Sequence, residues 1–149
     1  MTLCYLDASA WVKRYWREVG SEWIHQLFAT ENVLCCASLG FVEVLATLFR
    51  KRHAGEMDVQ FWENARRSVR SDWDRFCHIE LTTAVRDTAV RVAEAAALRG
   101  ADAVHLASAL VLQSRLETVA QGVIMVASDR ELGAAARHFG LRVADPEQE

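Results

Sequence analysis

Short apolar runs that alternate with helical segments constrain the fold of this chain more than any other feature. Runs without internal polar alternation lie at residues 2–6, 32–37, 78–82 and 123–127, with a weaker one at 141–143. Such runs are typical of strands buried on both faces of a sheet. Helical periodicity occupies the segments between them, at residues 9–17, 21–29, 39–53, 58–76, 84–98, 102–117 and 130–138. This alternation predicts βαβ units with right-handed crossovers and a parallel sheet covered by helices on both faces.

The segment 58–76 shows the helical period most clearly. Charged side chains occupy one face, and the opposite face is an apolar stripe made of Val59, Trp62, Val69, Trp73 and Phe76. Glycines at positions 100 and 140 lie where the preceding helices are expected to end.

The chain is expected to form one domain over residues 1–149, with a frayed acidic tail from about residue 144 to residue 149. A hydrophobic content of 52% with 25% charged residues is typical of a globular protein with a large core. No segment approaches the roughly 20 apolar residues of a membrane span. The N-terminus reaches Asp7 and Lys13 without the apolar stretch of a signal peptide. These features predict a cytoplasmic protein that does not enter a membrane.

Four cysteines support the same location. They show no C-x-x-C spacing and no paired histidines, so neither a zinc site nor a disulfide framework is expected. A free thiol in or beside an apolar run behaves as a small hydrophobic side chain. We therefore expect reduced core residues at Cys4, Cys35, Cys36 and Cys77.

Acidic residues follow two of the predicted strands. Asp7 comes directly after the run at 2–6, and Asp129 comes soon after the run at 123–127. Ligands of open α/β sheets bind beyond the carboxyl ends of the strands, so these two carboxylates can converge. Mg²⁺ is held by such groups, with water and substrate phosphate completing its coordination. The two acids therefore raise the hypothesis of metal-dependent phosphodiester chemistry.

Both acids also have a structural interpretation. Asp7 suits the N-cap of the helix that starts near residue 8, although Ser9 can cap instead and leave Asp7 free for a cation. Ser128 and Glu131 match a capping box. That box would place Asp129 at the first helical position, where the helix dipole favours a carboxylate. The sequence leaves both interpretations open at Asp7 and slightly favours the structural one at Asp129.

Two further acids, Asp102 and Glu43, lie on predicted helices. Asp102 starts a helix that is apolar nearly all round, so its carboxylate needs a partner or a metal ion. His105, one turn later, is expected to be a packed or hydrogen-bonded neighbour. Glu43 lies opposite the apolar stripe of its helix, where a solvent-exposed glutamate is the default. The small residues Gly40 and Ala46 would, however, let another group approach that face closely.

Four motifs resemble those of PIN-domain ribonucleases, closest to the VapC-like toxins of toxin–antitoxin pairs. They span residues 5–15 around Asp7, 41–45 around Glu43, 101–107 around Asp102 and 126–132 around Asp129. Each motif is weak alone, but all four occur in order over nearly the whole chain. The resemblance implies the PIN fold, a three-layer α/β/α sandwich with a short central parallel sheet, and it implies that the four acids share one groove.

This resemblance also implies roles for the residues. Mg²⁺ or Mn²⁺ would be bound by Asp7, Glu43, Asp102 and Asp129, with Ser9 supporting Asp7. Some PIN proteins carry a further acid after the fourth motif, and Glu131 is the nearest candidate. The implied activity is an endoribonuclease that cleaves single-stranded or looped RNA with a metal-activated water. The implied partners are a cognate antitoxin and a second copy of the chain in a homodimer.

Basic clusters at residues 13–17, 50–53 and 66–70 are candidates for phosphate contacts, although the net charge is −3. Solvated helix faces are the favoured explanation of any single cluster. Lys13 and Arg14, in the first cluster, are the candidates for substrate binding.

Two other functions fit the same motifs. One is an RNA-processing or DNA-directed PIN nuclease without an antitoxin. The other is a catalytically inactive PIN-like module that binds nucleic acid or protein and uses its acids as helix caps. A phosphohydrolase of the haloacid dehalogenase type would need a second aspartate two residues after Asp7, where this chain has Ser9.

Overall fold

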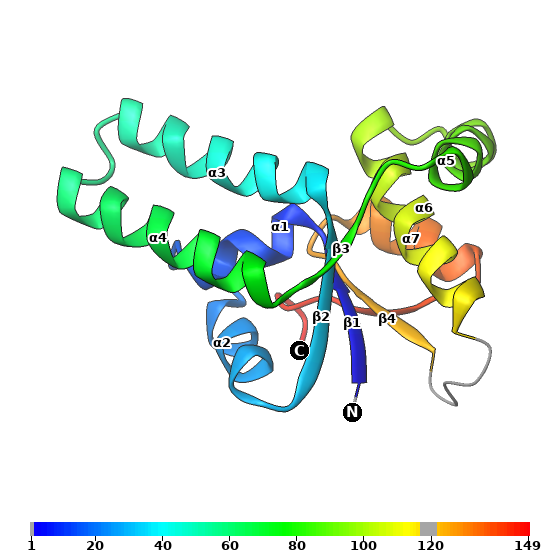
Figure 1. Cartoon of the computed structure of the whole chain (residues 1–149), viewed down its shortest axis with the longest axis horizontal. Coiled ribbons are helices and arrows are strands. Elements are labelled where there is room, and N and C mark those ends of the chain that lie inside the picture. Colours follow the sequence, from blue (N-terminus) through cyan, green and yellow to red (C-terminus); the bar gives the residue numbers. More distant parts are fainter. Residues whose placement is uncertain (1, 117–121) are drawn as a thin grey trace.

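The computed structural model describes residues 2–116 and 122–149 and contains a five-stranded parallel sheet between two layers of helices (Figure 1). The strands are β1 (Thr2–Leu6), β2 (Asn32–Ala37), β3 (Cys77–Ile79), β4 (Val123–Val126) and β5 (Arg142–Ala144). The helices are α1 (Ala8–Trp11), the 3₁₀ turn η1 (Val12–Arg14), α2 (Ser21–Ala29), α3 (Ser38–His53), α4 (Val59–Arg75), α5 (Thr83–Ala96), α6 (Gly100–Arg115) and α7 (Arg130–His138). The predicted fold class is confirmed.

The strand order is β3-β2-β1-β4-β5, with β1 at the centre. All neighbouring strands are parallel. The chain therefore extends the sheet on one side of β1 through β2 and β3, and then returns to extend it on the other side through β4 and β5.

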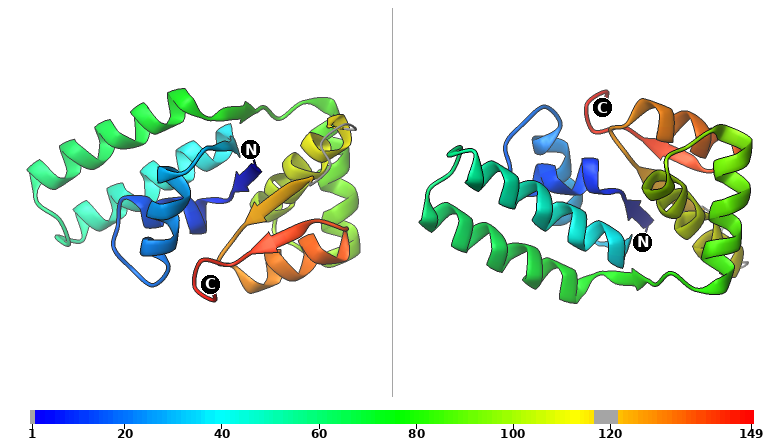
Figure 2. Two further views of the ribbon diagram at one scale, coloured as in Figure 1. Left: turned by 90° about the horizontal axis from the view of Figure 1, so that it is seen from below. Right: turned by 90° about the horizontal axis from the view of Figure 1, so that it is seen from above.

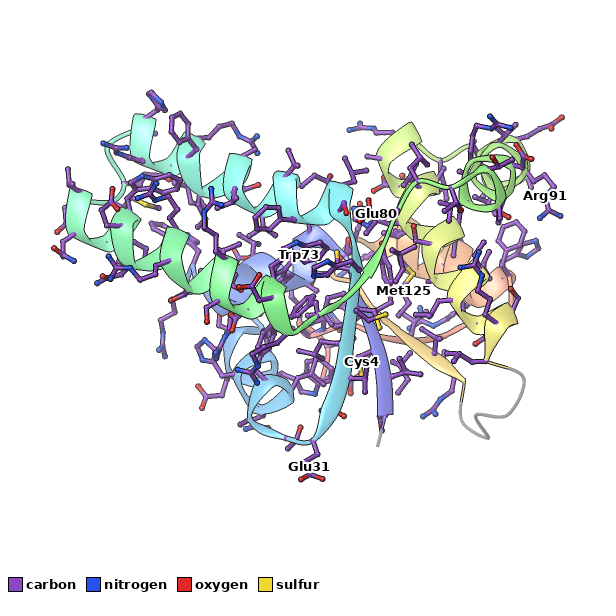
Figure 3. All side chains as sticks on the ribbon, viewed as in Figure 1. Cys4, Glu31, Trp73, Glu80, Arg91 and Met125 are labelled. Atoms are coloured by element: carbon purple, nitrogen blue, oxygen red, sulfur yellow. The ribbon has the colours of Figure 1, made fainter. Side chains whose placement is uncertain are left out.

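Alternate residues of β1 face different helical layers. Tyr5 joins a core shared with α5, α6 and α7, whereas Cys4 and Leu6 join an aromatic-rich core shared with α1 to α4. Cys4 and Met125 point into the interior, while Glu31 and Arg91 point outward (Figure 3). Burial on both faces explains why the strands have apolar sequences without alternation.

Helices α3 and α4 form a hairpin that projects beyond the sheet (Figure 2). Aromatic contacts hold the two helices together: the ring centroids of Phe41 and Trp73 are 5.2 Å apart, and those of Phe49 and Trp62 are 5.4 Å apart. α3 starts directly at the carboxyl end of β2, so its first turns lie at the sheet edge where ligands of α/β proteins bind.

Most predicted elements exist, and their bounds differ by a few residues. The strands at 2–6 and 32–37 and the helices at 21–29 and 130–138 have the predicted bounds. The segment 9–17 is shorter, because α1 passes into a 3₁₀ turn that ends at Arg14. The strand predicted at 78–82 is β3, which ends at Ile79. The helix predicted over 102–117 runs from Gly100 to Arg115, and residue 117 lies outside the described residues.

Three local predictions were wrong. Gly100 begins α6, and the left-handed residue that ends α5 is Ala97, with a φ of 52°. Cys77 is exposed because it lies on the edge strand β3, although the other three cysteines are buried as expected. Val59 is exposed because the first turn of α4 lies at the projecting end of the hairpin. The prediction for Gly140 is confirmed, since it follows α7 with a φ of 90°.

The acidic tail, which we expected to fray, packs against the body. Pro146 is buried, and a Cβ at Gly20 would lie only 2.9 Å from the Pro146 Cβ. Glu147 Oε1 lies 3.7 Å from Lys13 Nζ. The tail is ordered because β5 delivers it beside η1 and the loop that precedes α2.

Within the described part of the chain, no single helix is long and apolar enough to cross a membrane. α5 and α6 satisfy the length and hydropathy requirement only as a pair that is bent by 119° at their junction.

Candidate active site

The candidate site lies at the carboxyl ends of β1 and β4, where the growth of the sheet changes direction. Leu6 and Val126 are register partners, and Asp7 N donates a hydrogen bond to Val126 O at 3.1 Å. The residues that follow the two strands therefore start side by side. Open α/β sheets bind their ligands at such a switch point.

Asp7 is buried at the start of α1, with only 4% of its surface exposed. Its Oδ1 accepts a hydrogen bond from Ala10 N at 3.1 Å, so Asp7 is the N-cap. Ser9 Oγ lies 2.8 Å from each oxygen of the same carboxylate and donates to it. Burial raises the pKa of Asp7 to about 6, and the charge of Asp129 acts in the same direction. Ser9 thus supports Asp7 and does not replace it as the cap.

Asp129, and not Ser128, is the N-cap of α7. Asp129 Oδ1 accepts a hydrogen bond from Leu132 N at 3.0 Å, so the capping-box interpretation was wrong. Ser128 N instead donates to Ser9 Oγ at 3.2 Å, which holds Ser128 at the end of the strand layer. Asp129 is half-buried, whereas Glu131 is exposed. Of these acids, only Asp129 lines the groove described below.

Asp102 lies in the first turn of α6 and is half-buried. Burial raises the pKa of Asp102, and the charges of Asp129 and Glu43 raise it further, while His105 opposes the shift. The charge of Asp129 also acts on Asp7. The four predicted acids therefore belong to one electrostatic neighbourhood, although they come from four separate parts of the chain.

Glu43 faces this neighbourhood from α3. Its Oε1 shares a hydrogen bond with His105 Nε2, and His105 Nδ1 lies 2.7 Å from the Tyr5 hydroxyl. A Cβ at Gly40 would lie 2.3 Å from Cys36 Sγ and 3.2 Å from His105 Cε1, so the missing side chain makes room first for the thiol and then for the imidazole. Glu43 keeps 33% of its side-chain surface exposed, so the default expectation of a solvent-exposed glutamate is met in part, and the contact with the imidazole is what it lacked. The expectations of a hydrogen-bonded His105 and of a close neighbour beside Gly40 are confirmed.

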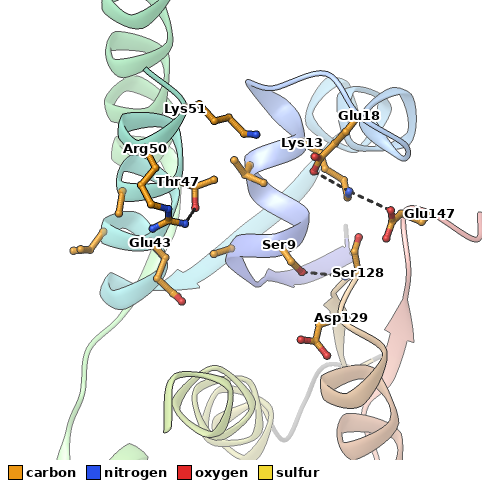
Figure 4. A pocket seen from close by; sticks show the side chains of 14 residues that line it. Ser9, Lys13, Glu18, Glu43, Thr47, Arg50, Lys51, Ser128, Asp129 and Glu147 are labelled. Carbon is orange, nitrogen blue, oxygen red and sulfur yellow. Dashed lines mark hydrogen bonds and ion pairs between the residues drawn. The ribbon is translucent and has the colours of Figure 1, made fainter. Parts of the chain in front are cut away.

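A groove of about 720 Å³ opens between α1, α3 and the start of α7 (Figure 4). Its walls include Ser9, Glu43 and Asp129, while Asp7 is buried and is not among the lining residues. α3 continues the wall away from Glu43 through Thr47 and Arg50.

The two predicted basic residues have different positions. Lys13 lines the groove, where its Nζ pairs with Glu18 at 2.9 Å and with Glu147 at 3.7 Å. Arg14 does not line it, because its guanidinium faces Asp72 at 3.4 Å and lies over the Phe28 ring at 4.5 Å.

The donor chemistry of the site fits a hard divalent cation. Carboxylate oxygens are the ligands that Mg²⁺ prefers in proteins, and four of them surround the switch point. Among residues 2–116 and 122–149, no three acidic, histidine or cysteine side chains are already grouped closely enough to hold an ion. A cation would therefore have to draw the carboxylates together. The raised pKa values of Asp7 and Asp102 are expected of buried acids with like-charged neighbours.

Sequence reasoning missed Tyr5 and the groove residue Thr47, whereas Arg50 belongs to the basic cluster at 50–53 that was a candidate for phosphate contacts. Tyr5 is the one hydroxyl-bearing residue between Leu3 and Leu6, and it lies two positions before Asp7. Its place in an apolar run was a usable signal, because a buried hydroxyl needs a partner. Thr47 and Arg50 follow Glu43 at the spacing of one helical face, which was a second signal.

The family model of the PIN domain matches residues 4–138. The chain belongs to the PIN-domain family. Among its relatives, Ribonuclease VapC45 of Mycobacterium tuberculosis (strain CDC 1551 / Oshkosh) is 35% identical over 144 residues, which cover 97% of this chain and 96% of the relative. This PIN-domain chain is therefore VapC-like, as the motifs predicted.

Solved structures agree with the PIN fold. PAE2754 from Pyrobaculum aerophilum has a TM-score of 0.65 at 22% identity, with 99% of this chain and 85% of that chain covered. DNA-bound VapBC from Salmonella typhimurium has a TM-score of 0.64 at 17% identity, with 98% and 99% covered.

Proposed function

We propose that this PIN-domain protein is a divalent-metal-dependent endoribonuclease and the toxin of a toxin–antitoxin pair. One observation carries the proposal: Asp7 and Asp129 follow neighbouring strands at the switch point of the sheet, the charge of Asp129 acts on both Asp7 and Asp102, and an open groove there is lined by Glu43 and Asp129. The identity of 35% over nearly the whole length to a protein named ribonuclease VapC45 supports the same activity.

In this proposal Asp7, Glu43, Asp102 and Asp129 hold Mg²⁺ or Mn²⁺. A bound cation supplies Lewis-acid activation of water and stabilises the charge that develops on the phosphate oxygens. Ser9 keeps the carboxylate of Asp7 oriented through its two contacts of 2.8 Å. Asp129, at the rim of the groove, is the carboxylate that an incoming phosphodiester would meet first.

The groove is the proposed path of the RNA. Arg50 is exposed on the groove wall, and its guanidinium donates to Thr47 Oγ1 at 3.3 Å, which orients it. Lys13 already has two carboxylate partners, so Arg50 is the stronger candidate for a phosphate contact. Arg14 is not part of this proposal, because its guanidinium faces Asp72 and Phe28.

A cognate antitoxin is the proposed protein partner, and the likeness to a VapBC complex supports it. An apolar groove of about 480 Å³ between α3 and α4 is a candidate surface for that partner. It contains Phe41, Leu45 and Phe49, and arginines 66 and 70 form its rim. The homodimer is likewise a proposal, and the mass of the purified protein in solution would test it.

Cleavage assays with and without metal test the enzymatic proposal. The purified chain should cleave an RNA pool in Mg²⁺ or Mn²⁺ and should not cleave it in excess EDTA. Asp102→Asn should lower cleavage at least about 100-fold, because it removes a carboxylate that would hold the cation at the reacting phosphate. Asp87→Asn is the matched control, since Asp87 is exposed on α5 and pairs only with Arg86.

Cleavage that persists in EDTA, or that is equal in wild type and Asp102→Asn, would refute the metal site. Cleavage of single-stranded DNA with intact RNA would favour the DNA-directed alternative.

Growth assays test the toxin proposal separately. Expression of the chain should arrest bacterial growth, and co-expression of an adjacent small gene should restore it. Asp102→Asn should remove the arrest, while Asp87→Asn should not. Normal growth with an active, soluble nuclease would favour an RNA-processing enzyme without an antitoxin.

A further inference from the structure

A hydrogen-bonded chain runs from the core of the sheet to the carboxylate of Glu43. Ala37 N donates to the Tyr5 hydroxyl at 3.1 Å, the hydroxyl lies 2.7 Å from His105 Nδ1, and His105 Nε2 contacts Glu43 Oε1. Its members come from β1, from the neighbouring elements β2 and α3, and from α6. Three distant parts of the sequence therefore converge on a single carboxylate oxygen.

The directions of these hydrogen bonds follow from the carboxylate of Glu43, which can only accept. His105 Nε2 therefore carries the ring hydrogen and donates to Glu43 Oε1. In this tautomer Nδ1 is an acceptor, so the Tyr5 hydroxyl donates to it while its oxygen accepts from Ala37 N. Oε2 of Glu43 is the oxygen that can turn toward the groove.

Packing allows the imidazole little freedom. His105 is 2% exposed and Tyr5 is completely buried. The two rings meet edge to face, with centroids 5.9 Å apart. At Gly40 a Cβ would lie 2.3 Å from Cys36 Sγ and 3.2 Å from His105 Cε1, so α3 packs closely against both side chains. The ring cannot swing away from Glu43 without opening the core.

We propose that Tyr5 and His105 are positioning residues for the divalent cation: they hold Glu43 Oε1 so that the other oxygen is presented to the ion. This inference rests on the proposed metal-dependent function. Partners that orient a ligating carboxylate typically change metal affinity by about 10–100-fold when they are removed. Glu43 is 33% exposed, so without the imidazole its side chain would sample several rotamers, and ordering it would oppose ion binding.

Mn²⁺ binding to the purified full-length chain, measured by titration calorimetry without RNA, tests the proposal. His105→Leu should weaken binding about 10–100-fold. His105→Gln keeps an amide donor near the position of Nε2, so it should lose at most about threefold. Tyr5→Phe keeps the ring and removes the hydroxyl, so its Mn²⁺ affinity should lie between the affinities of His105→Gln and His105→Leu. Val111→Ala, on the same helix and also buried in the core, should lower thermal stability and leave Mn²⁺ affinity unchanged.

A double-mutant cycle separates positioning from general packing. His105→Leu should cause no further loss of Mn²⁺ affinity in a Glu43→Gln background, because its effect passes through that carboxylate. Equal affinity of wild type and His105→Leu would overturn the proposal, as would an undiminished loss in the Glu43→Gln background. If His105→Leu does not fold, Tyr5→Phe takes its place: it should weaken Mn²⁺ binding in the wild-type background and cause no further loss in the Glu43→Gln background. Absence of Mn²⁺ binding by the wild type is a different failure, since it would overturn the metal-dependent function itself.

Discussion

The β1–α1 and β4–α7 junctions have the same local design and different surroundings. In both, a buried strand ends near an aspartate whose Oδ1 caps the following helix, at Ala10 N in one case and at Leu132 N in the other. Asp7 is 4% exposed and receives two contacts from Ser9. Asp129 is half-buried at the wall of the groove.

The comparison teaches that capping a helix and serving a reactive site are compatible roles. An N-cap uses one carboxylate oxygen, and the second remains available for a cation. The degree of burial then determines how each carboxylate behaves. At Asp7, burial disfavours the charge and raises the pKa to about 6. At Asp129, the carboxylate is within reach of a substrate in the groove.

The largest expected effect is at the deeper junction. Asp7→Asn should lower RNA cleavage on the order of 10³-fold, because it removes a carboxylate that would hold the cation by which the developing phosphate charge is balanced. Asparagine caps helices as well as aspartate, so the variant should remain folded. Initial rates in Mn²⁺ and thermal melting without metal are the paired measurements. A folded Asp7→Asn variant with wild-type rates would assign Asp7 to capping alone.

At the outer junction, Asp129→Asn should lower cleavage on the order of 10²-fold with little change in the melting temperature. The lost dipole interaction of a helix terminus is worth only about 0.3–1 kcal/mol. Glu131→Gln, in the first turn of the same helix but exposed, is the control and should retain activity. If Asp129→Asn cuts as fast as wild type, the two junctions differ in role as well as in depth.

The metal-free stability should depend on pH through Asp7. Its pKa is about 6 in the folded protein and near 3.8 when unperturbed, so the folded state binds more protons between these values. Stability should therefore fall as pH rises from about 4 to about 6, by an amount on the order of 3 kcal/mol. The Asp7→Asn variant should lack this pH dependence. The free energies of unfolding of wild type and variant, measured with denaturant at each pH, should therefore differ by the contribution of Asp7 alone. If the two free energies changed with pH in the same way, burial of the Asp7 carboxylate would not be the cause of the raised pKa.

The smallest expected effect concerns the approach of RNA along α3, the wall beside the β1–α1 junction. Arg50→Ala should weaken RNA binding a few-fold and reduce the slope of log affinity against log salt by about 1. Arg14→Ala should leave that slope unchanged, because Arg14 faces Asp72 away from the groove. Equal slopes for wild type and Arg50→Ala would place the RNA path on the side of the β4–α7 junction.

The sequence predicted the parallel sheet, the helices between its strands and the two strand ends that carry Asp7 and Asp129. These features follow from local patterns, since double burial makes each strand continuously apolar. The family motifs supplied Glu43, which helical periodicity alone would have left in solvent. The helix face of Glu43 is covered by His105, 62 residues later in the chain, and no local pattern can show such a contact.

Other features depend on packing between distant segments. The position of Arg14 was not predictable, because Asp72 on α4 competes for its guanidinium from 58 residues away. The capping of α7 was assigned to Ser128 because the local motif allowed it. Asp129 caps the helix instead, and Ser128 N donates to Ser9 Oγ, a contact that spans 119 residues.

The order of the site residues along the chain has a consequence during synthesis. A nascent chain that has emerged through α4 contains Asp7 and Glu43, but it lacks Asp102, Asp129 and the strand β4 that completes the crevice. Translation adds about 5–20 residues per second, so the nuclease is incomplete until the last third of the chain has been made. The α3–α4 hairpin is finished earlier. A partner that recognises this hairpin would therefore find its binding surface on the ribosome before the enzyme is able to cut.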